Sequence, residues 1–245
     1  MIKEKKSEEI TNEVKPLSNW LILLVGPYLI LVLMWFFFPV AGDWTWIEAW
    51  VYLGSWAIIY TIAYMLINRK DSTVIRNRAK VKKSGVTNEI KKEAGSDRWI
   101  YPLMTSIFFG GWILAGLNKR NGWTIVPLYL VIIGHILNIL GIIILNLSTY
   151  QNAFASKILD INEGQKLIDT GMYAHIRHPL YAGVWIMLIG TPFALGSWFA
   201  LIPAVLCMGL FLVRIKYEEE MLIKGMEGYE DYRKKVKYKL IPKIL

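Results

Sequence analysis

Residues 123–148 read WTIVPLYLVIIGHILNILGIIILNLS and contain no Asp, Glu, Lys or Arg. A stretch of this length forms a helix that crosses the hydrocarbon core of a bilayer, which is about 30 Å thick. Three further apolar stretches run over about 19–40, 46–68 and 99–117. Trp or Tyr residues mark several of their ends, as is typical of side chains at the membrane–water interface. The sequence therefore predicts four transmembrane helices.

A longer apolar segment follows, from Tyr181 to Ile215. It contains Gly190-Thr191-Pro192 and Gly196-Ser197, and Gly and Pro in such combinations are turn signals. We expect two short helices joined as a hairpin, and a tilted or re-entrant pair is the alternative. The predicted fold class is thus an all-α integral membrane protein with four transmembrane helices and a C-terminal helical hairpin, which makes five to six membrane segments.

The composition limits the partners of this chain. It is 55% hydrophobic and has 28 Lys and Arg residues against 19 Asp and Glu, a formal net charge of +9. Basic chains often bind nucleic acid, but here the basic residues flank apolar spans, so membrane lipids are the expected partner and nucleic acid is not. The single cysteine, Cys207, excludes an internal disulfide, and with three His residues a metal site is not expected.

The distribution of basic residues predicts the orientation in the membrane. The stretch 69–98 holds ten Lys or Arg residues against four acidic ones, and the tail 214–245 is also rich in basic residues. The positive-inside rule places the N-terminus, the loops 69–98 and 149–180, and the tail in the cytoplasm. Lys119 and Arg120 fall on the outer side and are the exception.

We expect one structural domain with three parts. Residues 1–18 are polar and form a cytoplasmic N-terminal tail. Residues 19–122 contain the first three transmembrane helices and the basic cytoplasmic loop. Residues 123–245 form a core with the fourth helix, the hairpin and the cytoplasmic tail.

Polar residues inside the fourth span have two interpretations. His135 and Asn138 lie three residues apart, with Gly134 and Gly141 on nearly the same helix face. Because burying polar groups in a membrane is costly, they either line a cavity or form a helix contact through small residues and an interhelical hydrogen bond. We favour the helix contact.

A cluster of basic, aromatic and glycine residues lies within residues 163–183, EGQKLIDTGMYAHIRHPLYAG. Pro179 suits the first turn of a helix because its φ is fixed, and the free N–H groups of such a turn attract anions. Arg177 and His178 stand beside it, and Gly183 allows the close approach of a ligand or another helix. An interface anchor would explain any one of these residues, whereas the whole cluster favours a binding site.

A second charged cluster follows the hairpin, at residues 214–222, RIKYEEEML. Arg214 and Glu218 are four residues apart and share one helix face. They belong either to a surface ion-pair network or to a site in which Glu218 or Glu219 receives a ligand's ammonium group. A hairpin would bring this cluster to the same membrane face as Arg177 and His178, which favours the site.

These motifs resemble those of the isoprenylcysteine carboxyl methyltransferase and phospholipid methyltransferase superfamily of membrane enzymes. The resemblance covers roughly residues 123–245. Its motifs are Glu-Gly-x-x-Leu at 163–167, Arg-His-Pro-x-Tyr-x-Gly at 177–183, Arg-Ile-x-x-Glu-Glu-x-x-Leu at 214–222, Gly-Tyr-x-x-Tyr at 228–232 and Ile-Pro at 241–242. Gln165 stands where the family often has His, so this chain departs from the family pattern at that position.

The resemblance implies binding of S-adenosylmethionine at the cytoplasmic end of the last helices. It implies Arg177 and Arg214 as catalytic residues. It implies a cofactor site made by Gln165, Leu167, Tyr173, His178, Tyr181, Gly183, Glu218 and Glu219. No protein partner is required by it.

The methyl acceptor would be a lipophilic molecule reached from the bilayer. An isoprenylcysteine-like or other lipid carboxylate is expected, and a phospholipid amine is the alternative. A carboxylate needs only a cation such as Arg177 or Arg214 to orient it, whereas an amine must first lose a proton, which His178 or Glu219 would accept. A non-catalytic binding or transport protein that retains the fold is the alternative from another class.

Overall fold

The computed structural model describes residues 17–70, 74–75, 95, 97–152, 161 and 165–244. Within these ranges every regular element is helical, which confirms the predicted all-α fold. The elements are α1 (Asn19–Leu23), α2 (Val25–Ala41), α3 (Ile47–Lys70), α6 (Asp97–Asn121), α7 (Leu128–Gln151), η1 (Gly171–Ala174), α8 (Pro179–Ala194), α9 (Leu201–Gly225) and α10 (Tyr229–Lys235). Most of the N-terminal tail and of the loop 69–98 lies outside the described residues.

Four helical spans are long and apolar enough to cross a membrane: Asn19–Ala41, Ile47–Lys70, Asp97–Asn121 and Leu128–Gln151. These confirm the four predicted transmembrane helices, with ends that differ by a few residues. Large apolar side chains lie exposed along them and along α9, as at Ile58 on α3. Such side chains face lipid in an integral membrane protein.

The first span, Asn19–Ala41, is helical as predicted and is divided at a single residue, Leu24, into α1 and α2. The break has a local cause. Pro27 has no N–H group to donate to the carbonyl of Leu23, four residues before it, and its ring crowds that carbonyl. Helical hydrogen bonding resumes at once, with Tyr28 N donating to Leu24 O at 3.0 Å.

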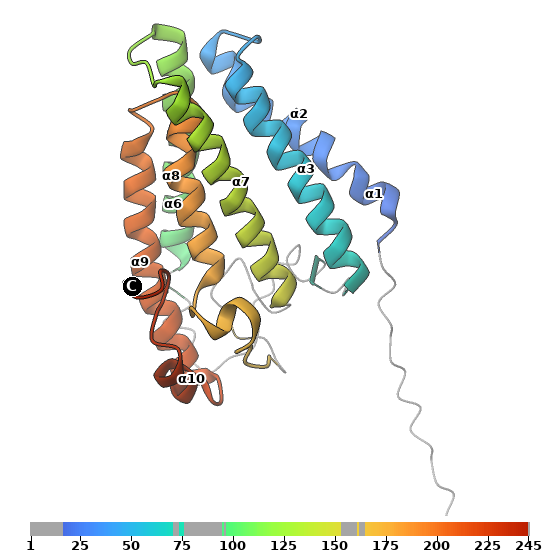
Figure 1. Ribbon diagram of the computed structural model, residues 1–245, viewed down its shortest axis with the longest axis vertical. Helices are drawn as coiled ribbons and strands as arrows, with labels where there is room; N and C mark the ends of the chain where they lie inside the picture. The colour runs from blue at the N-terminus through green and yellow to red at the C-terminus, as the bar shows by residue number, and fades with distance from the viewer. Residues whose placement is uncertain are drawn as a thin grey trace, which may run out of the picture.

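The connections between helices gather at two ends of the bundle (Figure 1). At one end lie the start of α8, the last turns of α9, and α10; we call it the site end. At the other, the turn end, lie the α2–α3, α6–α7 and α8–α9 connections. There Lys119 Nζ lies 3.7 Å from Asp43 Oδ2, so the basic exception in the charge pattern has a carboxylate beside it. The orientation itself remains a prediction.

Helices α7 and α8 pack backbone against backbone through glycines. A Cβ atom on Gly134 would lie 2.3 Å from Ala194 N, and one on Gly141 would lie 2.6 Å from Gly183 O. Gly190 meets α7 in the same way. Small residues allow this closeness in membrane helix pairs, so Gly134 and Gly141 form the helix contact that we favoured.

Asn138 also takes part in this contact, through hydrogen bonds deep in the bundle. Its Oδ1 accepts from Trp56 Nε1 at 2.7 Å, and its Nδ2 donates to Thr191 Oγ1 at 3.0 Å. Tyr52 OH lies 3.1 Å from the same Oγ1. The buried amide thus links α3, α7 and α8, and its polar groups are paired, as burial in a membrane requires.

The predicted hairpin is present, but one of its two expected turn signals was wrong. The chain reverses at residues 195–200, where Gly196 has a φ of 68°. Gly190-Thr191-Pro192 instead belongs to α8, which continues to Ala194. Tertiary packing explains the difference, because Gly190 is held against α7 and the adjacent Thr191 accepts a hydrogen bond from Asn138 of α7.

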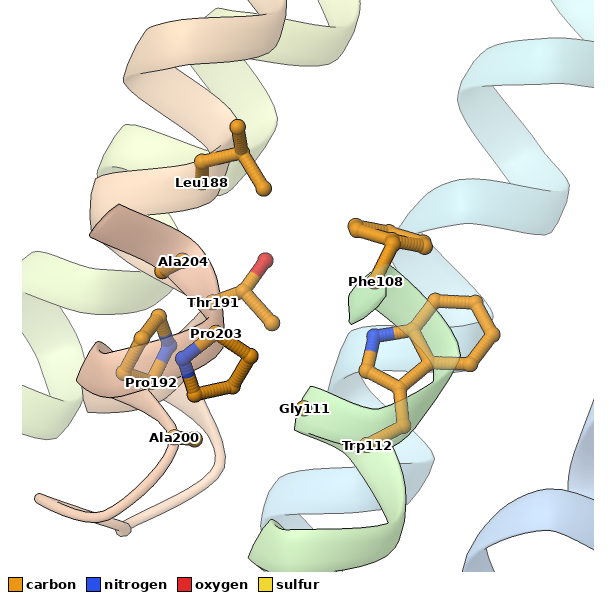
Figure 2. A pocket seen from close by; sticks show the side chains of 9 residues that line it. All are labelled: Phe108, Gly111, Trp112, Leu188, Thr191, Pro192, Ala200, Pro203 and Ala204. Carbon is orange, nitrogen blue, oxygen red and sulfur yellow. The ribbon is translucent and has the colours of Figure 1, made fainter. Parts of the chain in front are cut away.

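Helix α8 is short for a transmembrane helix. Its 16 residues extend about 24 Å at 1.5 Å per residue, less than the roughly 30 Å of hydrocarbon. Near its end, Figure 2 shows a small cavity between α6, α8 and α9, bordered by Trp112, Thr191 and Pro203. Its volume of about 10 Å³ has room for about one water molecule. This cavity is therefore too small for a ligand larger than water.

Candidate functional site

The site end buries a cluster of charged side chains. Asp97, Arg177, His178, Arg214 and Glu219 are each no more than 7% exposed. Buried charges are strongly unfavourable unless they are paired and hydrogen-bonded. The pairing of these five side chains therefore determines the geometry of this end.

The cluster is built around the start of α8. The helix begins at Pro179, as the sequence predicted. Just before it, Arg177 N donates to Tyr238 O at 3.0 Å and His178 N donates to Lys239 O at 2.9 Å. The C-terminal segment is thus tied by its backbone to the residues that precede α8, and it covers them.

The guanidinium group of Arg177 is held by several protein groups at once. Its Nε donates to Glu219 Oε1 at 2.6 Å. Its Nη1 donates to the carbonyl oxygens of Val236, at 2.7 Å, and Lys237, at 2.8 Å. Arg177 therefore joins α8, α9 and the C-terminal segment.

Glu219 is the counter-ion at the centre of this arrangement. Besides Arg177, its Oε1 lies 3.4 Å from His178 Nε2, and its Oε2 lies 3.1 Å from Lys239 Nζ. Burial alone would raise the pKa of Glu219, but the hydrogen bonds from His178 and Arg177 outweigh it and lower the pKa. The carboxylate is therefore ionised and a weak base.

Glu218 has a different environment from its neighbour. Its Oε2 accepts a hydrogen bond from Tyr181 OH, and its Oε1 lies 4.0 Å from His178 Nδ1. The Glu218 side chain is 23% exposed, against 8% for that of Glu219. The rings of His178 and Tyr181 stack, with centroids 5.6 Å apart. Of the two carboxylates, Glu218 is the one that a ligand can reach.

Arg214 is paired with a residue that the sequence did not single out. Its Nε and Nη2 donate to the two carboxylate oxygens of Asp97, at 3.0 and 2.9 Å. Its Cζ lies 5.5 Å from the centre of the Tyr181 ring. Tyr181 thus contacts Arg214 with its ring and Glu218 with its hydroxyl. Asp97 was visible in the sequence only as one acid in the basic stretch 69–98.

The segment before α8 packs under α10. Tyr232 OH donates to Tyr173 O at 2.7 Å, and Leu167 packs against the buried side chains of Tyr229, Tyr232 and Val236. The structure therefore brings the predicted cofactor residues Leu167 and Tyr173 to the site end.

Tyr229 is a second residue that was not predicted as part of the site. It is 3% exposed, and its hydroxyl has no hydrogen-bond partner in the described part of the chain. Burial, followed by the nearby carboxylates of Glu219 and Glu218, raises the pKa of Tyr229, so the hydroxyl keeps its proton and is a donor. Its place in the Gly-Tyr-x-x-Tyr motif was the signal that could have identified it.

The remaining predicted residues are placed as follows. Gln165 is half-buried in the segment that leads to η1. Gly183 faces α7, where an added Cβ would lie 2.7 Å from Leu145 N. The sequence predicted that either a ligand or another helix approaches this glycine closely, and the structure shows a helix. Glu163, the first residue of the Glu-Gly motif, lies outside the described residues.

Comparison with known proteins agrees with these motifs. Residues 127–224 match the model of the isoprenylcysteine carboxyl methyltransferase family. A stretch of 77 residues is 38% identical to the protein-S-isoprenylcysteine O-methyltransferase of Schizosaccharomyces pombe, over 31% of this chain and 33% of that protein. The match thus spans about a third of the relative's length. The resemblance seen in the sequence is thus confirmed over residues 127–224, which carry α7, α8 and nearly all of α9 and are similar to the isoprenylcysteine carboxyl methyltransferase family.

Proposed function

We propose that this chain transfers a methyl group from S-adenosylmethionine to the carboxylate of a lipophilic acceptor such as an isoprenylcysteine. The observation that carries the proposal is the position of Glu218, a partly exposed carboxylate beside the buried Arg177–Glu219–His178 cluster. It lies in the segment that matches the family. The name of the yeast relative, an O-methyltransferase of S-isoprenylcysteine, supports a carboxyl acceptor.

The residues at the site end fit the chemical groups of S-adenosylmethionine, whose sulfonium supplies the activated methyl group. Glu218 suits the ammonium group through a charge-assisted hydrogen bond. The hydroxyl of Tyr229, which has no partner among the described residues, is a donor for an acceptor atom such as a carboxylate oxygen. The stacked rings of His178 and Tyr181 offer aromatic surface. An unpaired buried hydroxyl is costly, and a ligand that accepts its hydrogen bond removes that cost.

The roles of the charged residues follow from their contacts. Methyl transfer is an in-line displacement, in which positioning supplies much of the rate. We assign Arg214, whose guanidinium is held by Asp97 at the same end of the bundle, to orienting the acceptor carboxylate. Arg177 and Glu219 connect the start of α8 with α9 and the C-terminal segment. We assign them to supporting the cofactor side of the site.

A phospholipid amine as acceptor is less well supported. An amine must lose a proton before it attacks, and the lowered pKa of Glu219 makes this carboxylate a poor base. His178 is the other candidate base, and its Nε2 faces the same carboxylate. A carboxylate acceptor needs no base and is therefore the better match to these side chains.

The transmembrane helices offer space for an apolar acceptor chain. A pocket of about 300 Å³ lies between α2, α3 and α7, with Val74 and Ile75 on its wall. Its other lining residues are Val25, Leu29, Trp56, Tyr60, Tyr64, Ile67, Leu145, Asn146 and Thr149. Leu145 belongs to both this wall and the α7 surface that meets Gly183, so the pocket lies next to the α7–α8 contact.

The proposal is tested by offering acceptors to the purified protein in lipid nanodiscs. Methyl-labelled S-adenosylmethionine is added with N-acetyl-S-farnesylcysteine or with phosphatidylethanolamine, and the lipid products are separated by chromatography. We expect label in the farnesylcysteine fraction, and none when the acceptor's carboxylate is replaced by an amide. Label only in the phosphatidylethanolamine fraction would favour the amine reaction, and label in neither would contradict both.

A further inference from the structure

The C-terminal segment, residues 236–244, and the end of α10 present basic side chains on the surface of the site end. Residues 232–245 contain six Lys or Arg residues and no Asp or Glu. The side chains of Lys235, Lys237 and Lys243 are exposed. The two acids of α10 each pair with another basic side chain of that helix. This surface is therefore strongly positive.

The C-terminal segment lies at the level where the lipid-facing surface of α9 begins. Figure 1 shows the chain after α10 turning back along α9, in the direction of the turn end. Leu240 is buried and packs against Tyr181 of α8 and Ile215 of α9. In the adjacent turn of α9, Leu212 and Val213 are exposed apolar side chains, which face lipid in an integral membrane protein.

The segment also exposes apolar side chains beside its lysines. Ile241 and Ile244 are 38% and 78% exposed, on either side of Lys243, and Tyr238 is exposed next to Lys237. Apolar and basic side chains alternate in this way in segments at a membrane surface, where the apolar groups enter the acyl boundary and the ammonium groups lie among the headgroups. The position and the composition of the segment thus both indicate a membrane surface.

The same segment holds the buried charge cluster of the site end. Arg177 Nη1 donates to the carbonyl oxygens of Val236 and Lys237, at 2.7 and 2.8 Å. Lys239 Nζ lies 3.1 Å from Glu219 Oε2, and two backbone hydrogen bonds tie the segment to the residues before α8. A partner that binds the docked segment, and not the released one, therefore stabilises the whole arrangement.

We propose that Lys235, Lys237 and Lys243 bind anionic phospholipid headgroups, and that this binding stabilises the C-terminal segment over the start of α8. Basic clusters next to a transmembrane helix are attracted to anionic headgroups. An acidic protein would pair with the lysines but would leave the neighbouring isoleucines exposed at the level of the lipid-facing surface, so a lipid surface is the better match. Neither part of this binding requires methyl transfer.

Hydrogen exchange of the backbone amides of Arg177 and His178 reports on the docked segment, because both amides donate to its carbonyl oxygens. Exchange is measured by mass spectrometry in nanodiscs of phosphatidylcholine, with and without phosphatidylglycerol. We expect phosphatidylglycerol to slow the exchange by about three-fold or more. The difference should disappear in about 1 M NaCl, where the Debye length is about 3 Å.

A triple variant, Lys235→Gln with Lys237→Gln and Lys243→Gln, removes three charges and keeps the backbone carbonyls of the segment. We expect its exchange to be the same in both kinds of nanodisc. Lys119→Gln with Arg120→Gln is the matched control, because it also removes basic side chains that flank a transmembrane helix, but at the turn end. This control should keep the lipid dependence of the wild type.

Equal exchange of the wild type in both lipids would overturn the proposal, as would an unchanged lipid dependence in the triple variant. If the triple variant does not fold, Lys237→Gln and Lys243→Gln decide singly, since each should lose part of the difference. Equal protection by polyglutamate added to phosphatidylcholine nanodiscs would also overturn it, because an acidic partner would then suffice without a lipid surface. Exchange is measured without methyl donor or acceptor, so these results are independent of the proposed function.

Discussion

Arg177 and Glu219 form a buried ion pair, Nε to Oε1 at 2.6 Å, that connects the residue two before α8 with the polar end of α9. Both side chains are nearly inaccessible, at 5% and 8% exposure. The same carboxylate holds Lys239 of the C-terminal segment. The Glu219 side chain therefore connects α9 with two segments distant in the sequence, the start of α8 and the C-terminal segment.

The lowered pKa of Glu219 predicts how stability depends on pH. A carboxylate with a folded-state pKa below its ordinary value of 4.5 contributes stability above pH 4.5, and this is lost as the pH falls toward the folded-state pKa. We expect the thermal midpoint in detergent to fall on acidification below about pH 4.5. In Glu219→Gln the fall should be smaller, from a lower starting midpoint. Glu230→Gln, at an exposed residue, should behave like wild type; if Glu219→Gln does too, the ion pair does not stabilise the fold.

Replacing Glu218 should weaken the binding of the cofactor product. Glu218→Gln removes the charge that we assign to the ligand's ammonium group, and a charge-assisted hydrogen bond contributes about 1.5–3 kcal/mol. We expect S-adenosylhomocysteine affinity, measured by calorimetry, to fall by this amount. The exposed Glu227 provides the control, since Glu227→Gln makes the same change of charge. Equal affinities in the two variants would remove Glu218 from the site.

Tyr229 and Tyr232 should respond differently to loss of their hydroxyls. Tyr229→Phe removes a buried hydroxyl without a partner in the described residues, so the thermal midpoint should stay or rise. Its affinity for S-adenosylhomocysteine should fall by about 0.5–1.5 kcal/mol, the net value of one hydrogen bond. Tyr232→Phe breaks the bond to Tyr173 O and should lower the midpoint. Unchanged affinity in Tyr229→Phe would show that its hydroxyl does not reach the ligand.

Gly183 should be intolerant of even one methyl group. In Gly183→Ala the new Cβ would lie 2.7 Å from Leu145 N and 2.8 Å from Gly141 O, so α7 and α8 would have to separate. We expect a lower thermal midpoint, because overpacking typically reduces the free energy of unfolding by about 1–3 kcal/mol. Gly209→Ala on α9 is the control, because an added Cβ meets nothing within 4 Å there. Similar midpoints in both variants would contradict the close α7–α8 contact.

The features that the sequence predicted depend on local patterns. The four spans follow from hydropathy and length, and the start of α8 follows from the fixed φ of Pro179. The α7–α8 contact through Gly134 and Gly141 was expected because small and polar residues in membrane helices usually face another helix. Each of these features needs only a few neighbouring residues to be recognised.

The features that were missed depend on residues distant in the chain. Asp97 and Arg214 are 117 residues apart, and nothing near either one indicates the other. The backbone pairing of Arg177 with Tyr238 likewise depends on where the C-terminal segment folds back. At Pro192 a local turn signal was overridden by packing of α8 on α7, which no local pattern reveals.

The most direct test of methyl transfer to a carboxylate is the base lability of the transferred methyl. Purified protein in nanodiscs receives methyl-labelled S-adenosylmethionine and N-acetyl-S-farnesylcysteine, and the extracted lipid is treated with alkali. Methyl esters release volatile labelled methanol, whereas methylated amines do not. We expect most of the lipid-bound label to become volatile for wild type, and at least ten-fold less product at limiting acceptor for Arg214→Lys, on the order of 1.4 kcal/mol. Lipid-bound label that stays with the lipid after alkali would contradict a carboxylate acceptor.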